Sequence, residues 1–360
     1  MTDRAAIFSQ LTQALAELYG DAASARRIAR AAGLGPTTLA WQPKAINAWD
    51  AILEAAAQPH HVERLLAVAT EEYPVHPPLQ QAHAAYDAWC AGLRAAYLQR
   101  VVEQTHGLRL GGVDPKTARE ASSGASLSLD AVYTALMTQQ IEPEPARQRA
   151  ARVSDRDAGR LSALALLDRA PRLALLGDPG SGKTTFVNFV ALCLAGEGLG
   201  AADINVQLLT TPLPKEEDAR ENPKPQPWRH GALLSVRIVL RDFAARGLPP
   251  VDQPASAAHL WQFIATELGP GLAEYAPHLH GELRTRGGLI LLDGLDEVPE
   301  AANRRLQVKQ AVQGFASDYP RCRFLVTSRT YAYQHQDWKL DGFSEAVLAP
   351  FSWGQIEQFV

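Results

Sequence analysis

The residues with the clearest chemical signature lie in the stretch RLALLGDPGSGKTTF, where glycines lead into a lysine and two threonines. Gly177, Gly182, Lys183 and Thr184 have the spacing GxxxxGK[ST], which binds phosphate when it follows a strand and opens a helix. Glycines let backbone N–H groups turn inward around a phosphate, and the helix N-terminus adds partial positive charge. We therefore expect a nucleotide here, with Lys183 at its β- and γ-phosphates and the Thr184 hydroxyl on Mg²⁺. The expected cofactor-binding residues are Gly177, Asp178, Pro179, Gly180, Ser181, Gly182, Lys183, Thr184 and Thr185.

Three carboxylates follow the apolar run of GLILLDGLDEVPE, namely Asp293, Asp296 and Glu297. Carboxylates crowded at the end of a buried strand repel one another and resist desolvation. A nucleotide with Mg²⁺ would offset that repulsion, because it brings the largest charges into the site. We expect Asp293 to hold the metal together with Thr184, directly or through water. Either Asp296 or Glu297 is expected to orient and deprotonate the attacking water, and the sequence leaves open which of the two is the base.

A strand-end arginine, Arg329, supplies the third part of the expected site in RCRFLVTSRT. Ligands of open α/β sheets bind beyond the carboxyl ends of the strands, so we expect Arg329 to sense or neutralise the γ-phosphate. Arg237 and Arg241, in SVRIVLRDF, are weaker candidates, and we expect them to pair with Asp242 or other local acids. The candidate catalytic residues are therefore Asp296, Glu297 and Arg329.

Five short apolar runs must position these residues, and they are RLALLG, LLSVRIVL, GLILLDG, RCRFLVTSR and SEAVLAP. They alternate with helical stretches, which predicts a parallel sheet with helices on its faces. The helix FVNFVALCL is apolar almost all round, so we expect it to pack inside the sheet layer. The proline-rich, charged stretch TPLPKEEDARENPKPQPW predicts a mobile surface insertion near residues 210–230. Residues 153–160, just before the first strand, are candidates for contacts with the adenine.

The first ~90 residues read as a compact helical bundle of five or six short helices. Asp21 can cap the second helix, and the last helix is expected to run on as a connector. We therefore predict an α+β multidomain chain, with an all-α bundle at 1–90, a connector and Gly/Ser-rich linker at 91–127, and an α/β P-loop NTPase domain at 128–360. The apolar positions expected to face the core of the bundle include Ile7, Leu11, Leu15, Ile46, Trp49, Ile52 and Leu53.

Composition excludes several classes of protein. The net charge of the 360 residues is -4, which gives no basic excess to bind nucleic acid or an anionic membrane. The three cysteines are far apart, so reduced thiols in the cytoplasm are the expectation. The sequence has neither an NKxD tetrapeptide nor a GxGxxG fingerprint, which disfavours a GTPase and a dinucleotide oxidoreductase. The last residues, FSWGQIEQFV, look like the opening turns of a helix, so we expect a fragment of a longer protein.

Taken together, LLGDPGSGKTT, LILLDGLDEVP and FLVTSRT resemble the NACHT ATPase module of the STAND class, over roughly residues 125–360. The first ~85 residues resemble the death-fold-like effector-associated domain of bacterial STAND proteins, carried by LYGDAASARRIARAAGL and KAINAWDAILEAA. The resemblance implies the additional-strand, AAA+-like order 5-1-4-3-2. It also implies a switch in which ADP holds a closed state and ATP exchange permits self-association. The N-terminal domain would then recruit an effector protein in antiphage defence or programmed cell death.

Two other functions remain open at the level of the sequence. An AAA+-like remodelling or motor ATPase would need brisk turnover and a basic channel, which the acidic balance disfavours. An adaptor or binding module with a degenerate P-loop is disfavoured by the intact Lys183, Thr184 and Asp293. We expect ATP turnover to be slow, because a switch needs differential binding of two states and not flux.

Overall fold

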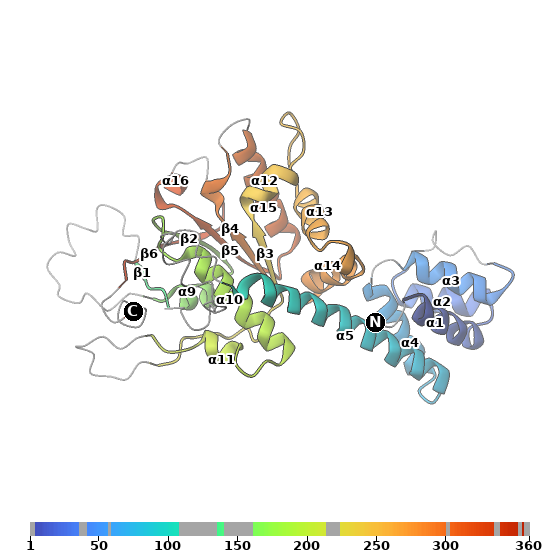
Figure 1. The fold of residues 1–360 in the computed structure, drawn as a ribbon. Helices are drawn as coiled ribbons and strands as arrows, with labels where there is room; N and C mark the ends of the chain where they lie inside the picture. Colours follow the sequence, from blue (N-terminus) through green and yellow to red (C-terminus); the bar gives the residue numbers. More distant parts are fainter. Residues whose placement is uncertain are drawn as a thin grey trace, which may run out of the picture. The chain divides into compact units, whose positions relative to one another are not determined.

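The computed structural model describes residues 4–35, 42–56, 59–107, 135–139, 161–213, 224–299, 303–334, 339–351 and 355. Nearly all of the predicted linker and the candidate adenine segment at 153–160 lie outside these residues. The chain divides into two compact units (Figure 1). Unit 1 comprises residues 1–97 with 268–282, and unit 2 comprises residues 98–267 with 283–360.

Unit 1 is helical, as the sequence predicts, and its N-terminal helices are amphipathic. Asp21 caps the second helix, because its side chain accepts hydrogen bonds from the N–H groups of Ala23 and Ser24 at 2.9 and 3.0 Å. Trp49, at the centre of the third helix, is fully buried and donates its indole N–H to the carbonyl of Tyr19. The helices are α1 (Arg4–Leu18), α2 (Ala22–Ala31), α3 (Ala45–Ala55), α4 (Pro59–Glu72) and α5 (Pro77–His106), which continues into unit 2 from Leu98.

One predicted core position of the bundle is wrong. Ile46 is 44% exposed, although Trp49, Ile52 and Leu53 on the same helix are buried. Ile46 lies in the first turn of α3, directly after the N-cap region at Lys44. A periodic pattern predicts which face of a helix is apolar. It does not predict whether a residue in the first turn of that face, such as Ile46, is covered by another element.

Residues 268–282 belong to unit 1 and form η2 (Pro270–Tyr275) and most of α14 (Ala276–Thr285). Their aromatic rings pack on α5. The ring centroids of Tyr275 and Tyr97 are 5.2 Å apart, and those of His278 and Trp89 are 5.4 Å apart in an edge-to-face arrangement. This packing could not be predicted from the sequence, because the two segments are ~180 residues apart in the chain.

Unit 2 is built on a six-stranded sheet in the order β1-β6-β2-β5-β4-β3. The five predicted strands are present and parallel to their neighbours, and counted in chain order they stand as 5-1-4-3-2. The sequence did not predict β1, which adds two antiparallel residues to the outer edge of β6. The strands are β1 (Thr138–Gln139), β2 (Arg172–Leu176), β3 (Ser235–Val239), β4 (Leu289–Asp293), β5 (Arg323–Ser328) and β6 (Ser344–Leu348).

Helices cover both faces of this sheet (Figure 1). The chain passes from β2 through α10 to β3 at the far edge, and the later crossovers run back in the opposite direction. Because crossovers between parallel strands are right-handed, α10 lies on one face, and α13 and α15, which pack against each other, lie on the other. The helical elements of unit 2 are α9 (Ala163–Arg169), α10 (Lys183–Leu199), α11 (Val206–Leu209), α12 (Leu240–Arg246), α13 (Ala257–Glu267), η3 (Leu295–Glu297), α15 (Arg304–Asp318) and α16 (Thr330–Gln334).

The helix that follows the phosphate loop is buried as expected. Ten residues of α10 are buried, from Phe186 to Gly196. After the predicted insertion the chain contacts α9: Asp168, 2% exposed, accepts hydrogen bonds from the backbone N–H and the Nε of Arg229 at 2.7 and 2.8 Å. Among the helices that the structure describes, none combines the length and apolar character needed to cross a membrane.

Candidate functional site

The phosphate loop connects β2 to α10, and its shape depends on glycine. Gly180 and Gly182 have φ angles of 77° and 84°, a left-handed conformation that residues with a Cβ rarely adopt. A Cβ at Gly177 would lie 2.7 Å from the hydroxyl of Ser181, so a side chain there would force that hydroxyl to move. The first N–H groups of a helix have no acceptor within the helix, so the start of α10 directs donors toward the loop. The predicted loop residues therefore form a turn that can surround an anion.

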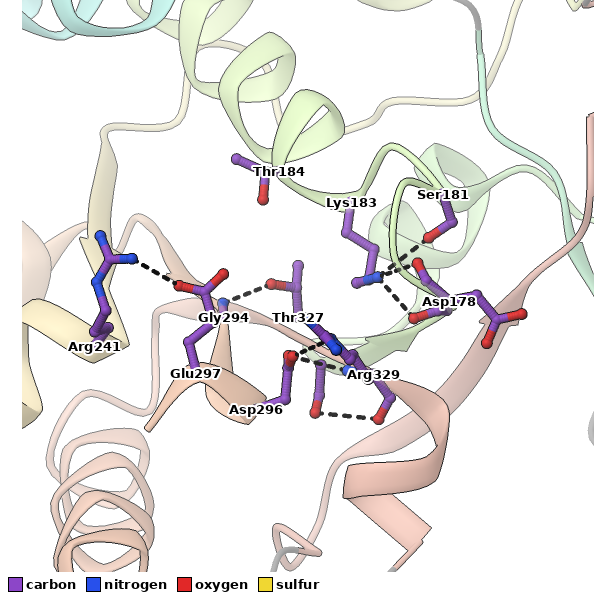
Figure 2. Close-up of polar contacts among 12 residues, drawn as sticks. Asp178, Ser181, Lys183, Thr184, Arg241, Gly294, Asp296, Glu297, Thr327 and Arg329 are labelled. Atoms are coloured by element: carbon purple, nitrogen blue, oxygen red, sulfur yellow. Dashed lines mark hydrogen bonds and ion pairs between the residues drawn. The ribbon is translucent and has the colours of Figure 1, made fainter. Parts of the chain in front are cut away.

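Lys183 extends back across this loop (Figure 2). Its ammonium group donates hydrogen bonds to the carbonyls of Gly177 and Asp178 at 2.7 and 2.9 Å, and to the hydroxyl of Ser181 at 3.2 Å. Burial lowers the pKa of Lys183 below its ordinary value, although the Asp296 carboxylate opposes the shift. A partly desolvated cation gains most from a nearby anion, so the lysine is well placed to receive a phosphate.

Asp293, at the end of β4, is 5% exposed and has three polar partners. Its Oδ1 accepts hydrogen bonds from the hydroxyl of Thr327 at 2.7 Å and from that of Thr184 at 3.2 Å. Its Oδ2 lies 3.5 Å from an Nη atom of Arg237. Thr327 in turn accepts a hydrogen bond from the N–H of Gly294 at 2.9 Å (Figure 2), which holds its hydroxyl in place beside the carboxylate.

Asp296 and Arg329 form a two-point contact. The backbone N–H of Arg329 donates to Oδ1 of Asp296 at 3.1 Å, and its Nε lies 2.8 Å from Oδ2 (Figure 2). The Asp296 side chain is only 10% exposed, whereas that of Arg329 is 56% exposed. The sequence predicted that both residues lie at the same sheet edge, but it did not predict their pairing.

Glu297 is the most accessible of the three acids, with its side chain 45% exposed. Its Oε2 lies 3.5 Å from Nη1 of Arg241, which follows β3 at the start of α12 (Figure 2). The Nε of Arg241 is also 3.6 Å from Asp242. The prediction that Arg237 and Arg241 pair with local acids is confirmed, and the acids include Asp293 and Glu297 as well as Asp242.

The residues at this edge fit a nucleotide that carries Mg²⁺. Thr184 and Asp293 present hard oxygen ligands 3.2 Å apart, directly beside the loop that holds Lys183. Mg²⁺ keeps several waters and usually takes only one or two protein ligands besides the phosphates of its substrate. Within the described ranges, no group of three or more His, Cys, Asp or Glu side chains could hold a metal by itself.

The sheet explains which predicted residues come together. Leu176 pairs with Ser328 and Val239 pairs with Asp293, so the ends of β2, β5, β4 and β3 lie at one edge. The phosphate loop therefore lies at the carboxyl end of the sheet together with Asp293, Asp296, Glu297 and Arg329. Sequence reasoning assigned no role to Thr327 and did not identify Asp293 as the acid that Arg237 contacts.

Comparison with known protein families agrees with the resemblance seen in the sequence. A model of the NACHT domain matches residues 172–360, which is more than half of the chain. A model of effector-associated domain 1 matches residues 4–87. No curated protein matches the chain.

Proposed function

The chain belongs to the NACHT domain family, and from this premise we propose that its loop binds ATP and ADP with Mg²⁺ and that exchange between them switches a signalling state. A NACHT domain joined to an effector-associated domain makes the chain a STAND-type NTPase signalling module. The proposal is carried by one observation: Lys183, Arg329 and the bonded pair of Thr184 and Asp293 lie where three adjacent strands end. Adenine nucleotides are favoured because the sequence has no NKxD tetrapeptide.

Each part of the site has a role in this proposal. Lys183 binds the β- and γ-phosphates, and its half-buried ammonium group supports that role. Thr184 and Asp293 hold Mg²⁺, directly or through water. Arg329 contacts the γ-phosphate, which only the triphosphate carries.

Discrimination between the two nucleotides is the physical basis of the switch. A ligand shifts a conformational equilibrium only by the difference in its affinities for the two states. To move a population from 1:99 to 99:1, a ligand must bind one state roughly 10⁴-fold more tightly than the other. The contacts with the γ-phosphate must therefore be strong. Slow hydrolysis would then reset the state, and rapid turnover would serve no purpose.

The helical bundle of unit 1 contains no residues of the nucleotide site, and we assign it to protein contacts. In this proposal the triphosphate state self-associates, and the bundle recruits an effector protein in antiphage defence or programmed cell death. The family composition supports self-association and effector contact in general terms.

Substitution of Lys183 tests the nucleotide site. We expect wild-type protein, purified and then denatured, to release ADP or ATP on chromatography, and Lys183→Ala to release almost none. Each charge-assisted hydrogen bond contributes about 1.5–3 kcal/mol, so the affinity for Mg-ADP should fall roughly 10- to 150-fold by calorimetry. Lys309→Ala, on α15, is the matched control and should retain wild-type nucleotide. If Lys183→Ala retained as much nucleotide as the control, the proposed phosphate site would be wrong.

A further inference from the structure

Asp296 and Glu297 are adjacent acids, yet their surroundings differ enough to give them different tasks. We infer that Asp296 positions Arg329 for the γ-phosphate and does not activate water, which leaves Glu297 as the water-activating acid. This inference rests on the proposed function and deepens it.

The geometry of the Asp296–Arg329 contact carries the inference. Both carboxylate oxygens of Asp296 are engaged, one by the backbone N–H of Arg329 and the other by its Nε. One contact holds the backbone of Arg329, and the other restrains its guanidinium group at Nε. Because the side-chain contact uses Nε, the terminal nitrogens of Arg329 remain as the donors that can reach a phosphate. The 56% exposure of this side chain agrees with a group that extends into the site while its base is held.

The same contact makes Asp296 a poor base. A carboxylate that takes a proton from water needs an accessible oxygen, and the Asp296 side chain is 10% exposed with both oxygens engaged. Protonation would also remove the charge that holds Arg329. Glu297 is 45% exposed, and its contact with Arg241 at 3.5 Å is too long for a well-formed hydrogen bond. An accessible carboxylate with one loose partner can accept a proton without releasing another part of the site.

Lys183 and Arg329 carry like charges at the same end of the sheet and repel each other, and the Asp296 carboxylate, which holds Arg329, offsets part of that repulsion. Without this carboxylate, Arg329 would lose its tether and move away from Lys183, and the γ-phosphate would lose one of its two cationic partners.

A double-mutant cycle on the full chain tests the inference. The variants are Asp296→Asn, Arg329→Gln and the double substitution, and Glu297→Gln is the matched carboxylate-to-amide control. The readout is the ratio of affinities for Mg-ADP and for a non-hydrolysable Mg-ATP analogue, measured by displacement of a fluorescent ADP. A merely structural defect would lower the affinity for both nucleotides, whereas loss of an aligned Arg329 lowers the affinity for the triphosphate alone.

We expect Asp296→Asn and Arg329→Gln each to lower the preference for the triphosphate by at least about tenfold. The double variant should lose no more of the preference for the triphosphate than either single variant, because each substitution removes the same aligned arginine. Glu297→Gln should keep the wild-type ratio and slow hydrolysis in a single turnover. Arg329→Lys keeps the charge without the Nε contact and should also lose the preference, so the test remains informative if Asp296→Asn fails to fold.

Three results would overturn the inference while leaving the nucleotide site intact. One is an unchanged affinity ratio in Asp296→Asn together with slowed hydrolysis, which would identify Asp296 as the base. Another is full additivity in the cycle, which would show that the two residues act independently. The third is a stronger preference for the triphosphate in Asp296→Asn, which would mean that Asp296 restrains Arg329. Failure of the wild-type chain to bind either nucleotide would instead overturn the proposed function, and this inference with it.

Discussion

Thr327→Val isolates a single hydroxyl that the structure places beside the carboxylate of Asp293. Thr327 is 1% exposed, and its hydroxyl donates to Asp293 at 2.7 Å while accepting from the N–H of Gly294 at 2.9 Å. Valine has nearly the same shape as threonine, so the substitution leaves little cavity and removes mainly the two hydrogen bonds. The sequence gives no reason to suspect that this residue matters more than its neighbours.

The structure sets the size of the expected effect. A hydrogen bond to a charged group contributes about 1.5–3 kcal/mol, and an unsatisfied backbone N–H adds about 1 kcal/mol or more. Asp293 keeps the hydroxyl of Thr184 at 3.2 Å and Arg237 at 3.5 Å, which offsets part of the loss. We therefore expect Thr327→Val to destabilise the ends of β4 and β5 by about 2–3 kcal/mol, which is roughly a 30- to 150-fold change in the opening equilibrium.

Hydrogen exchange read by mass spectrometry measures this opening directly, because local opening free energies set the exchange rates of protected amides. Peptides that cover residues 289–299 and 323–334 should exchange faster in Thr327→Val by that factor. Ser328→Ala is the matched control: its hydroxyl donates only to the neutral carbonyl of Arg329 at 3.3 Å, which is worth about 1 kcal/mol or less. Equal acceleration in the two variants, or none in Thr327→Val, would refute the reasoning.

Two further predictions concern packing and charge away from the site. Gly196→Ala in α10 should destabilise unit 2 by about 1–3 kcal/mol in urea unfolding, because its Cβ would lie 2.0 Å from the carbonyl oxygen of Ile204. A Cβ at Gly92 in α5 would meet nothing within 4 Å, so Gly92→Ala should raise the free energy of unfolding by about 0.5–1 kcal/mol. If the two substitutions changed the free energy of unfolding in the same direction, the steric argument would be contradicted. Burial, with a smaller contribution from Arg4, lowers the pKa of His278 from 6.5 to about 4, so the folded state binds fewer protons than the unfolded state between these values. The stability of unit 1 should therefore be full above pH 6.5 and fall as the pH drops from 6.5 to 4, and an NMR titration that gave His278 an ordinary midpoint would contradict this.

The strands could be predicted because each is an apolar run with its own boundaries. Runs such as LILLD are buried at every position, and this pattern is typical of strands covered on both sides. The sequence did not reveal β1, because a two-residue strand, Thr138–Gln139, shows no periodicity and depends on pairing with β6. The packing of residues 268–282 on α5 was hidden for a related reason: it depends on tertiary contacts between distant segments.

The candidate site also has features that the sequence could predict and features that it could not. The loop residues are consecutive, so their spacing alone predicts the turn, and strand-end residues were expected to converge because parallel strands end together. The contacts between side chains on neighbouring strands were not predictable, because the register of the two strands decides which residues meet. Arg237 pairs in register with Leu291, yet its side chain reaches Asp293 two residues further along β4. A signal was available, since an arginine inside the strand SVRIV is rarely buried without a partner.

The arginines change the explanation of the acidic cluster at the end of β4. From the sequence, a metal-bound nucleotide was the expected reason for three crowded carboxylates, and the arginines were not assigned to them one by one. In the structure each carboxylate has an arginine of its own: Arg237 with Asp293, Arg329 with Asp296, and Arg241 with Glu297.

The protein therefore neutralises the cluster by itself, and a metal that binds at Asp293 must share that carboxylate with Arg237. Like charges near one carboxylate weaken each other's binding. We expect this competition to weaken Mg²⁺ binding with either nucleotide alike, so the preference for one state must come from contacts at the γ-phosphate.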